Sequence, residues 1–423
     1  MTQPRTLGSP LRLGTRRSLL AQAQSSWVAR QLEALHPGLR VELVGVETRG
    51  DLLLDVPLST APGREFFVTE LDTALLAGQV DFTVHSYKDL SLERPAELIL
   101  AAVPRRADPR DVVLFGPSAA TRLAQRLPLR IGTGAPRRIT NLTDFLPTAL
   151  PGATPQPAPE FVSIRGNVDT RLARVHLPET EERHLDAVVL AMAGLSRLWT
   201  SASGCARLGT LLEGVRWMIL PLSECPTAPA QGALAIECRA DDAEMRRYLA
   251  GMHHPDTARH VDRERRVLAE WGGGCHQALG ATSISVPSVG WILHIRGRKP
   301  DGALMAQHLV DPHATSDDSA APTRTTPSPR TSVTGAETRA AIFVAKPSPV
   351  IDQGSLDGKR VWAGDLDGWL ALARAGVWVE GCAEGLGLRS LEGIFSEPVL
   401  GLASAPEDPV MANVGHPAEV RSP

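Results

Sequence analysis

The stretch DFTVHSYKDL, residues 81–90, predicts how the remainder of the chain is organised. Phe82 and Val84 belong to a short apolar run that is typical of a buried strand. A polar cluster from His85 to Asp89 follows at its end, and open parallel sheets bind ligands at the carboxyl ends of their strands. A lysine beside an aspartate there can hold an anion and move a proton. The alternative is a strand-end salt bridge on a solvated turn, which this decapeptide by itself favours.

Length and composition predict a cytoplasmic globular protein with about three domains. The formal charge of −3 and the pI near 6.5 argue against nucleic-acid or membrane-surface binding, which needs a basic domain. The N-terminus lacks the apolar segment of a secretory signal, and no apolar run is long enough to span a membrane. The 5 cysteines show no CxxC spacing, so we expect a reducing compartment without structural zinc or disulfides.

One local pattern recurs through the first half of the chain: a short apolar strand, a turn with a basic residue, and a helix. It occurs at 11–35, 129–146, 161–175 and 186–198. Alternating strands and helices predict βαβ units with parallel sheets, so the basic residues should gather at strand ends. The glycine-containing turns favour ligand binding for Arg16, Arg138, Arg165 and Arg171, because a guanidinium binds a carboxylate through two parallel hydrogen bonds. Arg105, Arg106 and Arg110 are instead expected on the surface.

Further along, the pattern changes. Prolines at 104 and 109 indicate a crossover into a second domain, and 218–239 contains two apolar runs around a Pro-rich turn. A charged amphipathic helix is predicted for 257–271 and a hairpin for 291–310. Residues 311–336 are rich in Pro, Ser and Thr, which is typical of a linker or insertion. One strand and one helix follow, and 401–423 is expected to be a flexible tail.

Cys275 directly follows a run of glycines, which allow close approach of other groups. It is therefore a candidate nucleophile or covalent attachment point, whereas the other cysteines are expected to be buried small apolar groups. Neither His85 nor His276 has a partner at metal-ligand spacing, so no metal is expected.

Eight motifs, taken in order, resemble the porphobilinogen deaminase (hydroxymethylbilane synthase) family from about residue 11 to 300. They are LRLGTRRS, VETRGD, FVTELDTALLAGQVDFTVHSYKDL, RADPRDV, IRGNVDTRL, LAMAGLSRL, APAQGALAIECR and GGGCHQ. The resemblance implies an α/β fold of three domains. The first two are periplasmic-binding-protein-like, with mainly parallel sheets and a cleft between them, and the third is a smaller α+β domain. Domain 1 would comprise 1–104 and 216–239, domain 2 would comprise 105–215, and domain 3 would comprise 240–310 and 337–400.

The resemblance also implies the activity, which is that of a transferase of tetrapyrrole biosynthesis, the route to haem, chlorophyll and cobalamin. Four porphobilinogens would be deaminated and joined head to tail on a dipyrromethane cofactor linked by a thioether to Cys275, and hydrolysis would release hydroxymethylbilane. Asp89 would be the catalytic carboxylate, protonating the leaving amine and stabilising the resulting cation. Porphobilinogen would be the partner of a monomeric enzyme. The residues implied to bind cofactor and substrate carboxylates, or to support them, are Arg16, Ser18, Gln24, Lys88, Thr133, Arg137, Arg138, Arg165, Arg171 and Arg197.

The chain departs from the family pattern in several places. GTGAPRR replaces GTSSLRR, so Gly134 and Ala135 offer no hydroxyls, and Tyr87 stands where the family has an aliphatic residue. The lid, implied to include Arg64 and Phe67, reads Gly-Arg-Glu in place of Gly-Lys-Gly.

Two other readings remain open. The chain could be a non-catalytic binding protein for an anionic small molecule, although the presence of both Asp89 and Cys275 argues against it. It could also be fused to a second tetrapyrrole enzyme, but residues 337–423 are too few for another large α/β domain.

Overall fold

The computed structural model describes residues 9–47, 68–273, 277–286, 289–299, 302–312, 341–347, 356, 358–397 and 399. Several predicted features lie outside these residues: the lid residues Arg64 and Phe67, the attachment residue Cys275, most of the predicted linker and the tail 401–423. None of the helices in the described part of the chain has the length and apolarity of a membrane-spanning segment.

The first lobe contains a five-stranded sheet in the order β2-β1-β3-β10-β4. Strand β1 is parallel to β2 and β3, whereas β10 runs antiparallel to its neighbours β3 and β4. The strands are β1 (Leu11–Arg16), β2 (Val41–Val46), β3 (Phe82–Ser86), β4 (Leu98–Ala102) and β10 (Leu234–Arg239). The helices are α1 (Leu19–Leu35), α3 (Thr69–Leu76) and α9 (Ala243–Ala250), with the 3-10 turn η1 (Tyr87–Asp89) after β3.

Local sequence explains the start of this lobe. Ser18 caps α1, its hydroxyl accepting a hydrogen bond from the Ala21 amide at 3.3 Å, as predicted. Val28 and Leu32 lie on the apolar stripe of α1 and are fully buried against β1 and β3.

The second lobe repeats this plan with the order β7-β6-β8-β5-β9. Here β6 is parallel to β7 and β8, and β5 runs antiparallel to β8 and β9. The strands are β5 (Asp111–Phe115), β6 (Arg130–Gly132), β7 (Glu160–Val162), β8 (Ala187–Ala191) and β9 (Arg216–Ile219). The helical segments are α4 (Ser118–Ala124), α5 (Pro136–Ala149), α6 (Val168–Leu172), η2 (Ala173–His176), α7 (Met192–Trp199) and α8 (Ala202–Leu211).

The chain passes between the lobes twice, from β4 to β5 and from β9 back to β10. Each sheet therefore contains one antiparallel strand that arrives directly from the other lobe. The predicted fold class, mixed α/β with sheets that contain parallel strands, is confirmed. The predicted return into the first lobe at residue 216 is too early, because Arg216–Ile219 is strand β9 and pairs with β5 of the second sheet.

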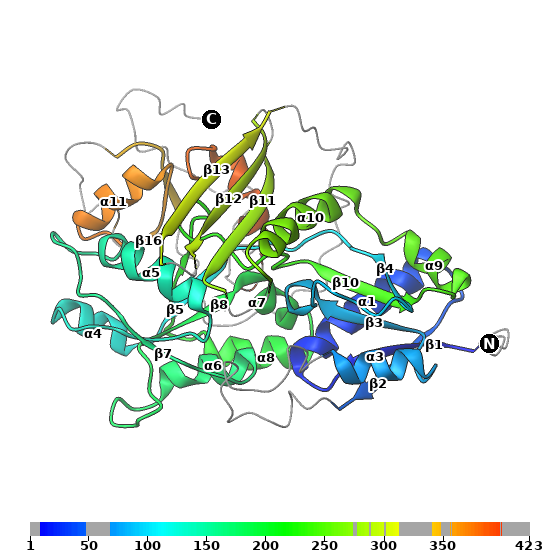
Figure 1. Ribbon diagram of the computed structural model, residues 1–423. Helices are drawn as coiled ribbons and strands as arrows, with labels where there is room; N and C mark the ends of the chain where they lie inside the picture. Colours follow the sequence, from blue (N-terminus) through cyan, green and yellow to red (C-terminus); the bar gives the residue numbers. More distant parts are fainter. Residues whose placement is uncertain are drawn as a thin grey trace, which may run out of the picture.

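A third sheet, β11-β12-β13, lies above the two lobes, with helix α10 beside it (Figure 1). Its strands are antiparallel: β11 (Leu279–Val286), β12 (Gly290–Arg298) and β13 (Leu304–Asp311). Helix α10 spans Pro255–Glu270 and packs on β11. The predicted hairpin corresponds to β12 and β13.

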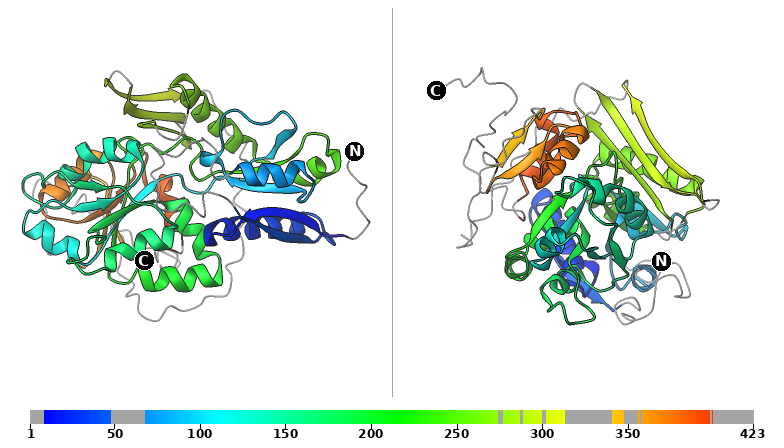
Figure 2. Two further views of the ribbon diagram at one scale, coloured as in Figure 1. Left: turned by 60° about the horizontal axis from the view of Figure 1, so that its bottom comes forward. Right: turned by 90° about the vertical axis from the view of Figure 1, so that its left-hand side faces the viewer.

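The C-terminal elements form a separate parallel sheet, which corrects the prediction that 337–400 belongs with 240–310. The sheet contains β14 (Ala341–Val344), β15 (Arg360–Ala363) and β16 (Val379–Cys382), followed by η4 (Leu388–Leu391) and α12 (Glu392–Phe395). Its helix α11 (Leu366–Arg374) packs on α5 of the second lobe (Figures 1 and 2). Trp369 explains the docking, since its ring meets Phe145 edge-on at 5.5 Å and its Nε1 donates to the Ala149 carbonyl at 3.0 Å.

Buried ion pairs hold the crossing segments together. Arg106 donates from both terminal nitrogens to Glu264 of α10, at 2.6 and 3.0 Å, and from Nε to the Gln231 carbonyl at 2.7 Å. Arg110 is buried and pairs with Asp108 at 2.7 Å. The expectation of a surface role is therefore wrong for Arg106 and Arg110, because the sequence does not show which acids face them across the junction. Arg105 is exposed, as expected.

Candidate active site

The predicted basic residues lie where the parallel strands end. Arg16 ends β1, and Lys88 and Asp89 lie in η1, directly after the neighbouring strand β3. In the second lobe Arg165 follows β7 and Arg197 lies on α7, which begins where β8 ends. The strand-end pattern read from the sequence thus corresponds to real strand ends in both sheets.

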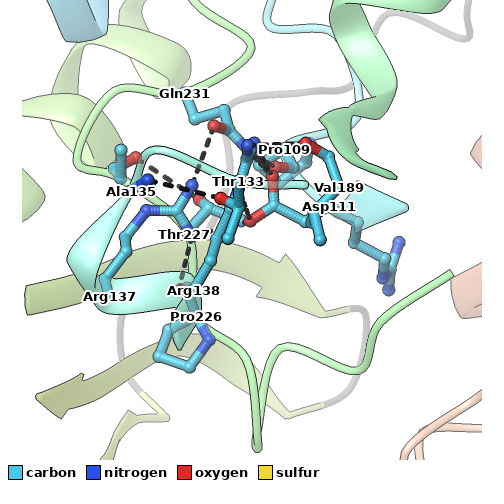
Figure 3. A network of polar contacts seen from close by, with 12 residues as sticks. Pro109, Asp111, Thr133, Ala135, Arg137, Arg138, Val189, Pro226, Thr227 and Gln231 are labelled. Atoms are coloured by element: carbon cyan, nitrogen blue, oxygen red, sulfur yellow. Dashed lines mark hydrogen bonds and ion pairs between the residues drawn. The ribbon is translucent and has the colours of Figure 1, made fainter. Parts of the chain in front are cut away.

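Gln231 joins the two sets of cations. It lies on the return segment just before β10, and it is 1% exposed. Its Oε1 accepts one hydrogen bond from Lys88 Nζ and another from Arg137 NH2, each at 3.2 Å. Its Nε2 donates to the Pro109 carbonyl at 2.7 Å (Figure 3). A cation from the first lobe and one from the second therefore share a single amide oxygen.

Asp111, the first residue of β5, compensates the charge of the paired arginines (Figure 3). One carboxylate oxygen accepts from Arg137 at 2.6 Å and from Arg138 at 3.1 Å, and the other accepts from Arg138 at 2.6 Å and from Gln231 at 2.8 Å. Burial by itself would raise the pKa of Asp111, but the two guanidinium charges outweigh it and hold that pKa well below its usual range. Arg137 and Arg138 are thus buried ion-pair partners.

Lys88 and Asp89 differ in their surroundings. Lys88 is partly buried, and Asp89 is exposed. Burial lowers the pKa of Lys88 to about 8; Asp89 and Asp111 oppose this shift, and the charges of Arg138 and Arg137 add to it. Burial therefore disfavours the charged ammonium, and an anion bound beside it would stabilise its charged form.

Arg171 lies at the same junction, on α6. Its Nε donates to the Gly166 carbonyl at 2.7 Å. Burial and the charges of Arg138, Arg174 and Arg165, partly opposed by Asp89, together lower the pKa of Arg171 to about 10. The positive charges of several guanidinium groups therefore repel one another at this junction. The carboxylate of Asp89, from the opposite lobe, partly offsets this repulsion.

The remaining predicted residues have local partners. Gln24 Nε2 donates to Ser86 Oγ at 3.0 Å, which ties α1 to the end of β3, and Thr133 Oγ1 accepts from the Ala135 amide at 3.3 Å. Arg197 NH2 donates to the Gly232 carbonyl at 2.5 Å, next to Gln231. Ser18 is engaged as the cap of α1. Through these hydrogen bonds they stabilise the ends of the strands and the segment that returns from the second lobe to β10.

Three buried residues of the kinds that can bind a metal ion lie close together around β3: Asp72, His85 and Glu237. Arg94 already binds both carboxylates, at 2.7 and 2.8 Å, and His85 Nε2 lies 3.3 Å from Glu237. Burial lowers the pKa of His85 to about 4. The guanidinium of Arg94 lies between the two carboxylates, where a metal ion would otherwise bind. We therefore interpret these residues as an ion-pair network that stabilises β3, the strand before Lys88.

Two central residues, Gln231 and Asp111, were not predicted as site residues. The available signal was weak: each is a polar residue that directly precedes or lies next to an apolar run, GALAI or VVLF, where a buried polar group needs a partner. Which partner it finds depends on the crossing of the two lobes.

This arrangement suits an organic anion with several carboxylates. Cations from both lobes converge on it, while Asp89 supplies an exposed carboxylate at its edge. A guanidinium can bind such carboxylates in pairs of hydrogen bonds, and an adjacent acid can exchange protons with a reacting group.

Comparison with known proteins gives a consistent result. The family model described as "Porphobilinogen deaminase, dipyromethane cofactor binding domain" matches residues 11–247. A porphobilinogen deaminase of Syntrophotalea carbinolica is 38% identical over 312 residues, covering 72% of this chain and 88% of the relative. The relative from Trichlorobacter lovleyi is 39% identical over 293 residues, covering 68% and 85% of the two chains. That from Acidothermus cellulolyticus is 42% identical over 282 residues, covering 65% and 76%.

The Asp111 network yields a stability prediction. Asp111→Asn leaves Arg137 and Arg138 buried without their carboxylate, and this should lower the free energy of unfolding by about 3–5 kcal/mol. Urea denaturation followed by circular dichroism measures the change. The matched control is Glu47→Gln, which removes an exposed pair with Arg17 and should cost less than about 1 kcal/mol. Equal, small losses in both variants would contradict the assignment of Asp111 as the compensating charge.

Proposed function

The chain belongs to the porphobilinogen deaminase family, and from this premise we propose which residues carry its chemistry. The enzyme is a transferase of tetrapyrrole biosynthesis that deaminates porphobilinogen and joins the units into hydroxymethylbilane, using a dipyrromethane cofactor. We propose Asp89 as the catalytic carboxylate and Cys275 as the residue that carries the cofactor through a thioether.

The donor chemistry of the site fits this cofactor. Dipyrromethane bears acetate and propionate groups, and the strand ends provide the cations that such carboxylates need. Lys88 and Arg171 are well placed, since burial lowers the pKa of both and a bound carboxylate would stabilise their charged forms. We propose that these two residues, with Arg16, Arg165 and Arg197, bind the carboxylates of cofactor and substrate. When bound, the cofactor supplies the pyrrole position to which the first substrate unit is joined.

Arg137 and Arg138 have a more indirect part in this proposal. Both are engaged with Asp111, and Arg138 also donates to the Val189 carbonyl at 2.8 Å. We propose that they form the rigid cationic floor of the site and that their field attracts the carboxylates. Gln24 and Thr133 hold the neighbouring strand ends, and Ser18 sets the start of α1.

The proposed task of Asp89 follows from its exposure and its neighbours. The departing amine of porphobilinogen needs a proton, and the cation left on the pyrrole needs a nearby negative charge. A carboxyl group can serve both steps, first donating its proton and then standing as carboxylate beside the cation. One observation carries the proposal most directly: the charge of Asp89 acts on Lys88 of its own lobe and on Arg171 of the other. A ligand held by both cations would lie against Asp89.

A non-catalytic binding protein for an anionic ligand remains the competing proposal. Both functions use the cations, but only the enzyme needs the proton carried by Asp89 and the thiol of Cys275. Variants at these two positions therefore separate the proposals.

We further propose a monomeric, cytoplasmic enzyme in which the domain that carries Asp89 comprises the first lobe, with β10 as one of its strands. The family resemblance supports the monomer. The thiols of Cys205, Cys225 and Cys382 support a reducing compartment, because they are not joined in disulfides.

The attachment of the cofactor can be tested by intact mass. Purified protein should be heavier than its sequence mass by one dipyrromethane, and Cys275→Ala should lose both this added mass and the activity. Cys205→Ala is the matched control, since Cys205 lies on α8 of the second lobe, and it should keep the added mass. An unmodified wild-type chain, purified from cells with ample porphobilinogen, would refute the proposed thioether.

Asp89→Asn should keep the fold and the cofactor mass but lose turnover by at least about 100-fold, because the carboxamide cannot donate the proton. Initial rates of hydroxymethylbilane formation measure the loss, and circular dichroism checks the fold. Near-normal turnover in this variant would refute the catalytic role of Asp89. A wild-type chain that forms no hydroxymethylbilane would favour the binding-protein proposal.

The pKa of Lys88 predicts a pH dependence. Its value of about 8 in the empty site means that the ammonium loses its proton, and with it its hold on carboxylates, as the pH rises through 8. The ratio kcat/KM reports groups of the free enzyme, which already carries the cofactor, and the cofactor carboxylates raise the pKa of Lys88. We therefore expect kcat/KM to fall along an alkaline limb whose midpoint lies above pH 8. Lys88→Arg stays charged in this range and should lose that alkaline limb, even if its rate at neutral pH is lower. The same limb in both proteins would contradict the assignment.

A further inference from the structure

Helix α10 makes direct contacts with the turn that contains Asp89. The guanidinium of Arg265 donates to the Leu90 carbonyl at 3.0 Å and to the Ser91 carbonyl at 2.7 Å. The same group lies over the ring of Tyr87, with 4.7 Å between Cζ and the ring centroid. These contacts lie on both sides of Lys88 and Asp89, so one side chain spans the whole turn.

The turn depends on such outside contacts. η1 is a single 3-10 turn, closed by the Leu90 amide donating to the Tyr87 carbonyl at 3.2 Å, and isolated 3-10 turns have poor hydrogen-bond geometry. Tyr87 and Leu90 are each 5% exposed and anchor the ends of the turn in one apolar cluster, to which α10 contributes Val261. Arg265 lies one helical turn beyond Val261, where it reaches the backbone of the turn.

A second contact links the end of α10 to the same region. After the helix ends at Glu270, Gly273 has a φ of +71°, and a Cβ at this position would come within 3.2 Å of the Leu92 side chain. Helix α10 and the backbone that follows it therefore run alongside residues 87–92.

We propose that Arg265 is a positioning residue for Asp89. Its planar fork binds two successive carbonyls, and its face stacks on Tyr87, so the backbone that carries the carboxylate is held against α10. The inference rests on the proposed role of Asp89. Tyr87 is a residue in which this chain departs from the family pattern, so the stacking contact is a property of this chain.

The test replaces Arg265 with methionine, which keeps an apolar stem and removes the fork. Displacement of the catalytic carboxylate should lower kcat roughly 10- to 100-fold. KM should change less than kcat, because Lys88 is the carboxylate-binding cation that lies in this turn, whereas Arg16, Arg165, Arg171 and Arg197 lie on other segments. Arg265→Lys keeps a charge over Tyr87 and can still reach one carbonyl, so it should recover part of kcat. Intact mass should show the cofactor retained in both variants.

Arg263→Met is the matched control on the same helix. Arg263 lies over the ring of Trp291, with 5.4 Å between Cζ and the centroid, and it faces β12 instead of the turn. Its loss removes a cation–π contact on the same helix and should leave kcat unchanged.

The outcomes separate this inference from its premise. If Asp89→Asn is inactive while Arg265→Met keeps the kcat of the Arg263→Met control, the positioning role is wrong and the proposed function stands. If Asp89→Asn is active, the premise itself fails. Loss of the cofactor mass in Arg265→Met would also overturn the inference, because the effect would then lie in cofactor attachment.

Discussion

Like charges repel, and this protein holds Lys88, Arg137 and Arg138 around one carboxylate and one amide. Asp111 compensates the two guanidinium groups, and Gln231 offers a single oxygen to both Lys88 and Arg137. Each of these buried polar groups thus has a partner, and the partner offsets the free-energy cost of its burial. The network still carries an excess of positive charge at strand ends, so a multiply charged anion complements it.

The double crossing of the chain makes this network possible. Because β5 and β10 each enter a sheet from the opposite lobe, Asp111 and Gln231 lie on the two segments that pass between the lobes. Arg106 and Glu264 tie those segments to α10. The position of the third sheet and its helix is therefore coupled to the site through buried hydrogen bonds, and α10 reaches the turn that carries Asp89.

Much of the local structure follows from the sequence. The apolar stripe and Ser18 predicted α1 to within a residue at its start. The repeated strand-turn-helix pattern predicted the strand ends that bear Arg16 and Arg165, and the stretch 81–90 predicted the one before Lys88. Short elements were missed, among them α4, α9 and β16, because a few residues carry too little periodicity. The docking of the C-terminal sheet on the second lobe was missed as well. The sequence around Trp369 does not show that its side chain contacts Phe145 and the Ala149 carbonyl, which are far away in the chain.

The sequence by itself determined the family, the identity of Asp89 and Cys275 as candidates, and the placement of cations after strands. These are properties of residues close together in the chain or of motifs in a set order. Only the tertiary structure decided that Arg137 and Arg138 are compensated by Asp111, that Gln231 links the lobes, and that Arg265 braces the turn of Asp89. These partners lie 26 to 175 positions apart along the chain. Their pairing depends on how buried charges find hydrogen bonds across lobes, which no local pattern encodes.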